Sequence, residues 1–164
     1  MKKKVTLFLI ISLVAVFGSI SCTGSNTGRI RGLDGGRYTA HFFRRQYRCF
    51  GSRIVLINDL QELKVWREKN LQSSELAEVM ESYSEKFFDV RQLILIEFWG
   101  GSLEFGVERV SYDDNVLTVE LQQIVPWGVR CGGLRTTMEA VPRIVVLEIT
   151  RISDDLDIEL IVSD

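Results

Sequence analysis

Few residues in this 164-residue chain have side chains and spacing suited to catalysis. The single histidine is His41, and Cys49 follows it by eight residues, so a nucleophile with a histidine base would have to be built around this pair. No group that would orient the histidine is recognisable nearby, and GxSxG, Walker and GxGxxG motifs are absent from the sequence. One histidine also excludes a histidine-rich metal site. We therefore expect a structural histidine, no catalytic residues, no metal and no cofactor.

Carboxylates are more numerous, and two groups of them fall at predicted turns. The segments 113–114 (DD) and 154–157 (DDLD) separate stretches that read as strands, and acidic side chains favour turns because they bond to nearby backbone amides. Metal binding at the second group is the alternative, although a calcium loop needs more oxygen ligands at regular spacing. Further acids alternate along the strands, as a solvated sheet face or as the carboxylate pair of a hydrolase, and the solvated face explains them better. These acids are Glu97, Glu104, Glu108, Glu120 and Glu148, with Glu97 and Glu120 as the pair to test.

Two loops combine a tryptophan with glycines and are the strongest candidates for a binding site. The first is WGGS at 99–102, and the second is PWGVRCGG at 126–133. Glycines permit close backbone approach, and exposed tryptophans are frequent binding hot spots. The alternative is that both tryptophans close the end of the core. The residues of the expected binding rim are Trp99, Gly100, Gly101, Ser102, Pro126, Trp127 and Gly128.

The N-terminal segment has the features of an export signal followed by an anchor. Three lysines at 2–4 precede an apolar run over 5–17 and the small residues before Cys22, in the order of a secretory signal peptide. Cys22 lies where a bacterial lipoprotein receives its lipid, but Ser19 stands in place of the usual leucine, so ordinary cleavage without lipidation is the alternative. We expect a signal peptide over 1–21, a lipidated Cys22 with a flexible glycine-rich tether over 22–36, and one globular domain over 37–164. The domain would lie outside the cytoplasm, on the cell membrane or outer membrane.

Two further cysteines, Cys49 and Cys131, are separated by 82 residues. An exported chain can oxidise such a pair, and closing a loop of this length would stabilise the fold by about 4–5 kcal/mol in the chain-entropy model. Two buried free thiols are the alternative. The spacing leaves both states open.

The charge balance argues against nucleic-acid binding. The formal net charge is −2, from 20 basic and 22 acidic residues, and removing the three lysines of 1–21 makes it 17 − 22 = −5. A mildly acidic domain lacks the excess of cations that drives binding by counterion release. The basic and aromatic segment 37–50 (RYTAHFFRRQYRCF) could form a patch for lipid headgroups or RNA, but a partly exposed first strand with solvated arginines is the favoured interpretation.

Hydrophobic periodicity predicts an α+β domain. A short strand over 54–57 leads into a capping box, Asn58-Asp59 with Glu62, that begins a helix through 69, and a second helix carries an apolar stripe from Leu76 to Phe87. From Gln92 the period changes to two, with strands over 93–99, 103–112, 116–125, 144–152 and 156–162. Short connections predict antiparallel neighbours. We expect a mostly antiparallel sheet of about five to six strands, with two helices packed on one side.

The segment from Tyr83 to Arg151 carries a pattern of structural residues. It contains a Phe pair, a Gly-Ser turn, a Val-rich strand, a proline step and a threonine-containing loop, at Phe87-Phe88, Gly101-Ser102, Val107, Pro126 and Thr136. This pattern resembles a group of uncharacterised exported bacterial lipoproteins and, more distantly, the C-terminal domain of PrcB, a lipoprotein subunit of a bacterial surface protease complex. Where the closer group commonly has Ile-Arg-His after the turn, this chain has Leu103-Glu104-Phe105. The resemblance implies a non-catalytic exported α+β domain, and the protease-subunit relatives imply a protease as partner.

These observations together predict a membrane-anchored bacterial lipoprotein that serves as a non-catalytic, protein-binding or accessory module of the cell envelope and assists a secreted enzyme complex. Its expected partners are the membrane, through the lipid, and an envelope or secreted protein, with no nucleic acid. A small-molecule or glycan binder that uses the two tryptophan loops is the first alternative. A hydrolase that uses sheet carboxylates is the second.

Overall fold

The computed structural model describes residues 25–44, 52–70, 74–101, 103–124 and 140–163. Within these ranges the chain forms eight strands and three helices. In chain order they are β1 (Ser25–Arg29), β2 (Arg37–Arg44), β3 (Arg53–Ile57), α1 (Leu60–Asn70), α2 (Ser74–Glu81), α3 (Glu85–Phe88), β4 (Arg91–Gly100), β5 (Glu104–Asp113), β6 (Val116–Ile124), β7 (Val141–Thr150) and β8 (Asp157–Ser163).

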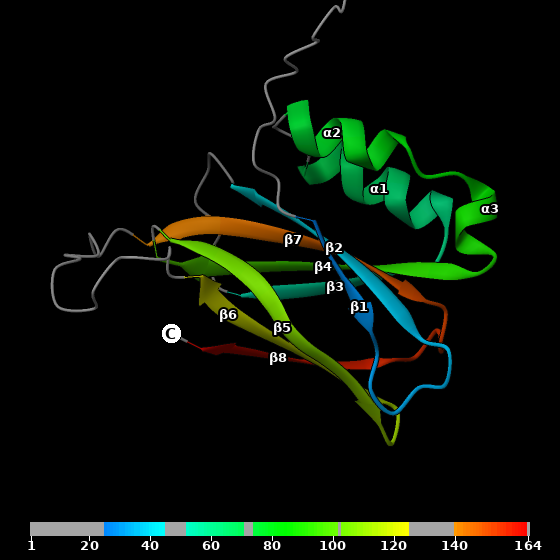
Figure 1. Ribbon diagram of the computed structural model, residues 1–164. Helices are drawn as coiled ribbons and strands as arrows, with labels where there is room; N and C mark the ends of the chain where they lie inside the picture. Colours follow the sequence, from blue (N-terminus) through cyan, green and yellow to red (C-terminus); the bar gives the residue numbers. More distant parts are fainter. Residues whose placement is uncertain (1–24, 45–51, 71–73, 102, 125–139, 164) are drawn as a thin grey trace, which may run out of the picture.

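The strands form two sheets, and the helices pack on the outer face of the larger one (Figure 1). The larger sheet has the order β1-β2-β7-β4-β3 with antiparallel pairing throughout, and the smaller has the order β5-β6-β8. The α+β class and the mostly antiparallel pairing are confirmed, but the eight strands exceed the expected five to six.

Two expected strand neighbours are wrong. The WGGS turn does not join two strands of one sheet, because β4 lies in the larger sheet and β5 in the smaller. Likewise, β8 does not pair with β7 but crosses to the smaller sheet, where it runs parallel to β6. A short connection therefore moves the chain between layers at both places, and the rule that short loops join antiparallel neighbours fails there.

Most of the expected tether is folded. Residues 25–29 form β1, which pairs with β2, and Ile30 is buried in the core between the sheets. This strand could not be recognised in the sequence, because Gly28 supplies no apolar side chain to the alternation. The ring of Tyr38 packs against Gly28, and a Cβ at that position would lie 2.6 Å from the ring. Backbone pairing, rather than apolar alternation, forms β1, and the folded domain includes residues from Ser25 onward.

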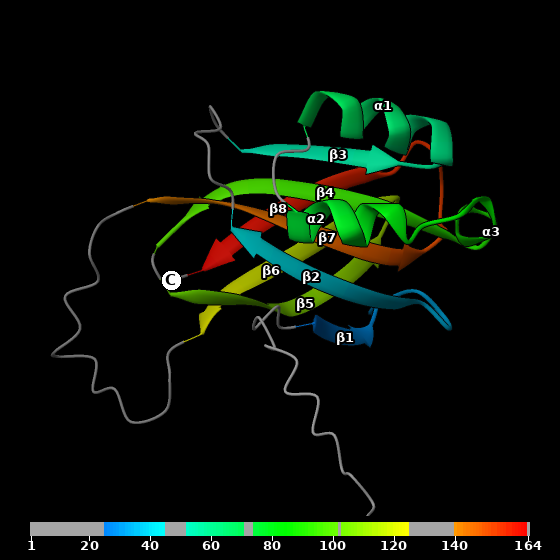
Figure 2. The same ribbon diagram turned by 90° about the horizontal axis from the view of Figure 1, so that it is seen from above.

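Apolar side chains form two cores, one on each face of the larger sheet. One lies between the two sheets, and the other lies between the larger sheet and the helices (Figures 1 and 2). The central strands β4 and β7 are covered on both faces, so their runs over 93–98 and 144–149 are apolar almost without interruption. Burial on both faces explains why these strands lack the alternation seen in β6.

The helical layer agrees with the sequence at its start and departs from it later. The amide of Glu62 donates to Asp59 Oδ1 at 2.7 Å, and the amide of Asn58 donates to Glu62 Oε2 at 2.8 Å, so the capping box is confirmed. The expected second helix is divided into α2 and α3, because the amide and hydroxyl of Ser82 both bond to the carbonyl of Val79 and end α2. No helix in the described part of the chain is long and apolar enough to cross a membrane.

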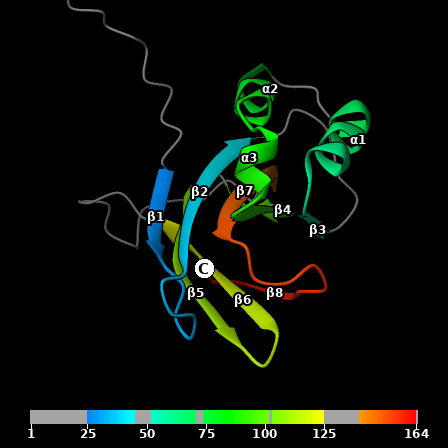
Figure 3. The same ribbon diagram turned by 90° about the vertical axis from the view of Figure 1, so that its right-hand side faces the viewer.

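The two edges of the larger sheet have different surroundings (Figure 3). Beside β1, the backbone of Arg31 bonds to β5: its amide donates to Val110 at 2.9 Å, and its carbonyl accepts from Tyr112 at 2.7 Å. At the opposite edge, β3 pairs with β4 and with no other strand in the described part of the chain, and α1 runs along it. Among the described residues both edge strands pair on one side only, but the chain just past β1 is bonded to the second sheet through Arg31.

Candidate functional site

The first tryptophan loop is organised by a buried arginine. Nη2 of Arg143 donates to the carbonyl of Gly101 at 2.9 Å and also to that of Leu103, and the guanidinium lies over the Phe105 ring, 5.2 Å from its centroid. Burial lowers the pKa of Arg143, and the nearby charge of Arg44 lowers it further. The guanidinium therefore holds the turn between the two sheets.

In this turn Trp99 is partly covered and Gly100 lies close to a buried ring. Trp99 is half-buried, and a Cβ at Gly100 would lie 2.6 Å from the Phe105 ring. The close approach of Phe105 accounts for the glycine at position 100, and the role of Trp99 stays a prediction. The remaining rim residues, Ser102, Pro126, Trp127 and Gly128, lie outside the described residues, so the rim as a whole remains a prediction.

Four polar side chains meet on the helix side of the larger sheet, around Glu148 of β7. Oε1 of this carboxylate accepts from His41 Nε2 at 3.0 Å and from the Tyr83 hydroxyl at 2.9 Å. Oε2 accepts from Arg91 Nη1 at 3.0 Å. We call these four residues the Glu148 cluster. It joins β2, β7 and β4 to the segment between α2 and α3.

The cluster fixes the ionisation of its members. Burial opposes the charged form of Glu148, but the hydrogen bonds from His41 and Tyr83 and the positive charges of His41 and Arg91 outweigh it, so its pKa lies below the ordinary value. Burial and the adjacent carboxylate raise the pKa of Tyr83. The tyrosine thus stays protonated as a donor to an ionised carboxylate.

The same geometry limits what the histidine can do. A carboxylate that orients an imidazole is one part of a nucleophilic triad. Among the described residues, however, no hydroxyl or thiol bonds to His41, and Oε1 of Glu148 is shared with Tyr83. The hydrogen bonds of the cluster link the sheet to the helical layer, and Cys49, the sequence candidate for a nucleophile, lies outside the described residues.

The carboxylates proposed as a hydrolytic pair do not meet. Glu97 lies on the helix side of β4, whereas Glu120 lies on β6 with its side chain on the outer face of the smaller sheet, bonded to Arg109. The core between the sheets separates them, so this pair is wrong. Glu148 shares a face with Glu97, but four residues along the strands place them about 13 Å apart, beyond the spacing of either glycosidase geometry.

The acidic turns also have structural roles. Asp114, together with Asn115, adopts positive φ in the turn between β5 and β6, and Asp154 forms an ion pair with Arg151. No group of three potential metal ligands occurs among the described residues. Cys22, Cys49 and Cys131 lie outside these residues, so lipidation and the disulfide remain predictions, as does the signal peptide over 1–21.

A groove of about 340 Å³ runs between β3 and α1. We call it the β3–α1 groove. Its apolar surface includes Val55, Trp66 and the 40% exposed side chain of Val65. Arg53 and Lys69 lie at one end, because α1 turns back along β3, and neither forms an ion pair with a described residue. The groove thus has an apolar floor and a basic end. It lies beside the edge of β3 that pairs with no described strand.

Sequence reasoning missed this groove, although one signal was present. The periodicity of α1 placed Leu63 and Trp66 inward, where the structure buries them. Val65 falls off that stripe and is 40% exposed, and it becomes part of an apolar surface only because β3 lies beside it. The neighbouring strand edge could not be inferred, because it depends on strand order.

Comparison with known proteins provides no further constraint: no family model, curated protein or solved structure matches the chain.

Proposed function

We propose that this chain is an exported, lipid-anchored protein of the bacterial envelope that binds an extended segment of a partner protein in the β3–α1 groove. The open edge of β3 beside an apolar groove is the observation that carries this proposal. In this proposal the chain is an accessory module and not an enzyme. The resemblance to exported lipoproteins supports the location.

The unpaired side of β3 supplies the main-chain part of the recognition. An edge strand presents free amides and carbonyls, and an added peptide can pair with them as a further strand. The five residues of β3 match a peptide segment of similar length, about 17 Å. Alternate side chains of that segment would point toward α1, where Val65 and Trp66 offer apolar surface.

The charges of the groove define the chemistry of the segment. Arg53 and Lys69 place two cations at the end of the groove where α1 finishes. Glu62, at the other end, is held by the amide of Asn58. An apolar segment with an acidic side chain facing Arg53 and Lys69 fits best.

The anchor would hold the domain close to the membrane. Cys22 precedes the first residue of β1 by three positions, and three residues span at most about 10 Å. A lipid on Cys22 would therefore keep the domain beside the bilayer, where other envelope proteins are concentrated. This short connection replaces the flexible tether over 22–36.

The alternatives have less support. Glycan binding through the tryptophan loops depends on an exposed Trp99, and this side chain is half-buried. Hydrolysis by Glu97 and Glu120 needs two carboxylates that lie on opposite outer faces.

The test is purification of the full-length chain from its native membrane in mild detergent, followed by mass spectrometry of bound proteins. Val65→Asp places a charge in the groove, and Val90→Asp is the matched control, since Val90 is 63% exposed and does not line the groove. We expect a stoichiometric partner that is retained with Val90→Asp and lost with Val65→Asp. Hydrogen exchange of the β3 amides should slow when the partner is bound.

Two results would contradict the proposal. One is a partner that binds Val65→Asp as well as it binds the unmodified chain. The other is a homodimer, detected by light scattering, that Val65→Asp dissociates, because it would assign β3 to a second copy. Cys22→Ala separately tests the anchor: it should release the protein from the membrane without changing the groove.

A further inference from the structure

Three arginines lie in one row that begins at β1, the edge of the larger sheet opposite to the β3–α1 groove. The row runs across β2 and β7 to β4. Arg29 of β1 pairs directly with Arg37 of β2. The amide of Arg37 donates to the hydroxyl of Thr150 on β7 at 3.0 Å, and Thr150 pairs with Arg91 of β4. Since neighbouring strands are about 4.8 Å apart, the row spans about 14 Å.

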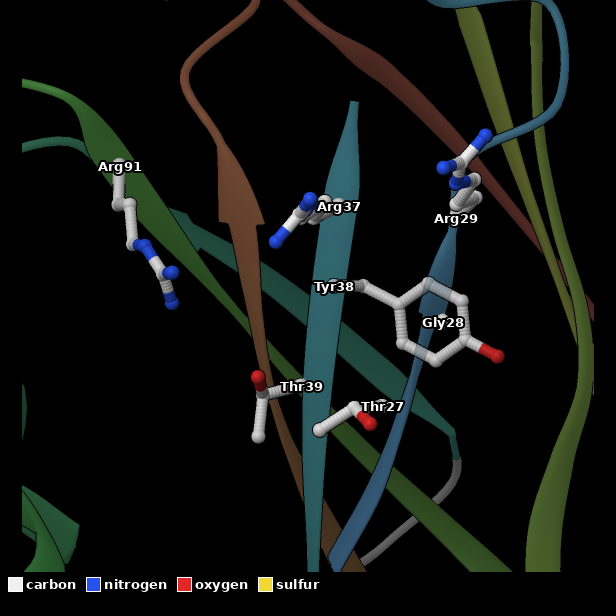
Figure 4. Close-up of a pocket in the computed structure, with 7 residues that line it drawn as sticks. All are labelled: Thr27, Gly28, Arg29, Arg37, Tyr38, Thr39 and Arg91. Atoms are coloured by element: carbon white, nitrogen blue, oxygen red, sulfur yellow. The ribbon is translucent and has the colours of Figure 1, made fainter. Parts of the chain in front are cut away.

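The row lies on the helix side of the sheet, where it is not covered. Arg91 is two residues before Leu93, which packs beneath the helices, so both side chains point to the same face. Figure 2 shows that no helix lies over β1. In Figure 4 the guanidinium groups of Arg37 and Arg91 point toward one another across the end of β7.

The positive charge of the row is largely uncompensated. Arg91 is paired with Glu148, but the side chains of Arg29 and Arg37 form no ion pair with any described residue. Three arginines and one glutamate leave a local charge of 3 − 1 = +2. Like charges directly opposite one another destabilise a sheet, so the Arg29–Arg37 pair has an electrostatic cost that a bound anion would remove.

The space beside the row suits a small oxyanion. A pocket of about 390 Å³ is lined by the three arginines together with Thr27 and Thr39 (Figure 4). Thr27 and Thr39 pair across β1 and β2, one row further along, and their hydroxyls bond to no described residue. Guanidinium groups bind phosphate oxygens in a bidentate manner, and hydroxyls supply further donors.

We propose that this pocket binds a phosphate group, with Arg37 as its principal ligand, Arg29 as a second cation beside it, and Thr27 and Thr39 as hydroxyl donors. Arg91, held by Glu148, borders the site and contributes its field. Lipid headgroups and soluble phosphate esters share this chemistry. The inference does not depend on the β3–α1 groove, which lies at the other edge of the sheet.

Calorimetry on the full-length chain in non-ionic detergent tests the site. Inorganic pyrophosphate is the soluble probe, with sodium chloride of equal ionic strength as the blank. Detergent micelles doped with phosphatidylglycerol, compared with phosphatidylcholine, are the lipid probe. We expect saturable binding of at least one probe, and at least a tenfold loss of affinity in Arg29→Gln/Arg37→Gln.

The control is Lys64→Gln/Lys86→Gln, which removes the same charge from exposed positions on α1 and α3. Binding retained in this control and lost in the arginine variant supports the proposal. Binding of phosphatidylglycerol alone identifies a lipid source, and binding of pyrophosphate alone identifies a soluble one. Absence of binding to both probes, or equal losses in both double variants, would overturn it.

Discussion

The two edge strands of the larger sheet, β1 and β3, have different surroundings. An edge strand exposes amides and carbonyls that invite pairing with another chain. At the β1 edge the chain is joined to the second sheet just past the strand, where Arg31 bonds to β5, and arginines and threonines make the surface polar. At the β3 edge the unpaired side remains beside an apolar groove.

We infer that the β1 edge contributes to the stability of the fold, whereas the β3 edge contributes to the binding of a partner. The β1 edge joins two sheets, so changes there should act on the whole fold. Among the described residues the β3 edge pairs with β4 alone, so changes to its exposed side chains should act on a bound segment and leave the fold unchanged. The variants below test this division, in order of expected effect.

Trp66→Ala should have the largest effect, because it removes the indole that lies beneath the β3–α1 groove and is 5% exposed. We expect a loss of about 3–5 kcal/mol in the free energy of unfolding, measured by urea denaturation. Hydrogen exchange should quicken in β3 and α1 more than in β1. Val65→Ala, at an exposed position, is the control and should change stability by less than about 0.5 kcal/mol. Equal effects of the two substitutions would mean that the exposed side of the groove also supports the fold. That result would contradict the assignment of the exposed β3-edge side chains to binding alone.

Gly32→Ala should disrupt the contact between the chain just past β1 and strand β5. Gly32 has φ +82°, and a Cβ there would lie 2.0 Å from the carbonyl oxygen of Tyr112. Left-handed backbone and a backbone clash together should cost about 2 kcal/mol or more, measured by thermal unfolding. Gly35→Ala has a similar φ of +68° but nothing within 4 Å, so it should cost only about 1 kcal/mol. If both variants unfold alike, the contact with β5 is unimportant.

Glu148→Gln should weaken the link between the sheet and the helices. The substitution removes the charge shared by His41, Tyr83 and Arg91, and should lower stability by about 1–3 kcal/mol near neutral pH. Because the pKa of Glu148 lies below its ordinary value of 4.5, its contribution is fully present above that pH. It is lost as the pH falls through the lower, folded-state value. Denaturation at several pH values should show a flatter acid limb for Glu148→Gln, and an unchanged limb would count against the cluster.

Arg37→Gln should have the smallest effect, and with the opposite sign. Removing one of two directly opposed arginines should raise stability by about 0.2–1 kcal/mol in the absence of phosphate. The gain should shrink at high ionic strength, because salt screens exposed charges. Chemical denaturation at low and high salt measures both effects. A loss of stability at low salt would mean that Arg37 makes a favourable contact, and would weaken the phosphate site as well.

The sequence predicted local features better than long-range ones. The capping box at Asn58, Asp59 and Glu62 depends on neighbouring residues, and the buried strands β4 and β7 depend on apolar runs, so both could be recognised. Strand β1 could not, because it contains Ser25, Asn26, Thr27 and Gly28 and is formed by pairing with β2. Which sheet a strand joins was equally hidden, since β5 and β8 change layers across short connections.

The candidate sites were also hard to predict from the sequence, because their residues come from distant positions in the chain. Glu148 was recognisable as one acid in an otherwise apolar strand, but its partners come from positions up to 107 residues away in sequence. Arg29, Arg37 and Arg91 carry no common motif, and only the register of four strands places them in a row. A site built across strands is visible in sequence only when its strand order is known.

The position of β7 between β2 and β4 determines when the sheet can assemble. Tyr38 pairs with Ile149, 149 − 38 = 111 positions later, so β2 leaves the ribosome, or an export channel, long before its partner. Contacts of such sequence separation are slow to form. During this interval the aromatic strand β2 has only β1 to pair with, and a holding chaperone would protect it. The N-terminal hairpin is therefore exposed to aggregation for most of the time before the chain is complete.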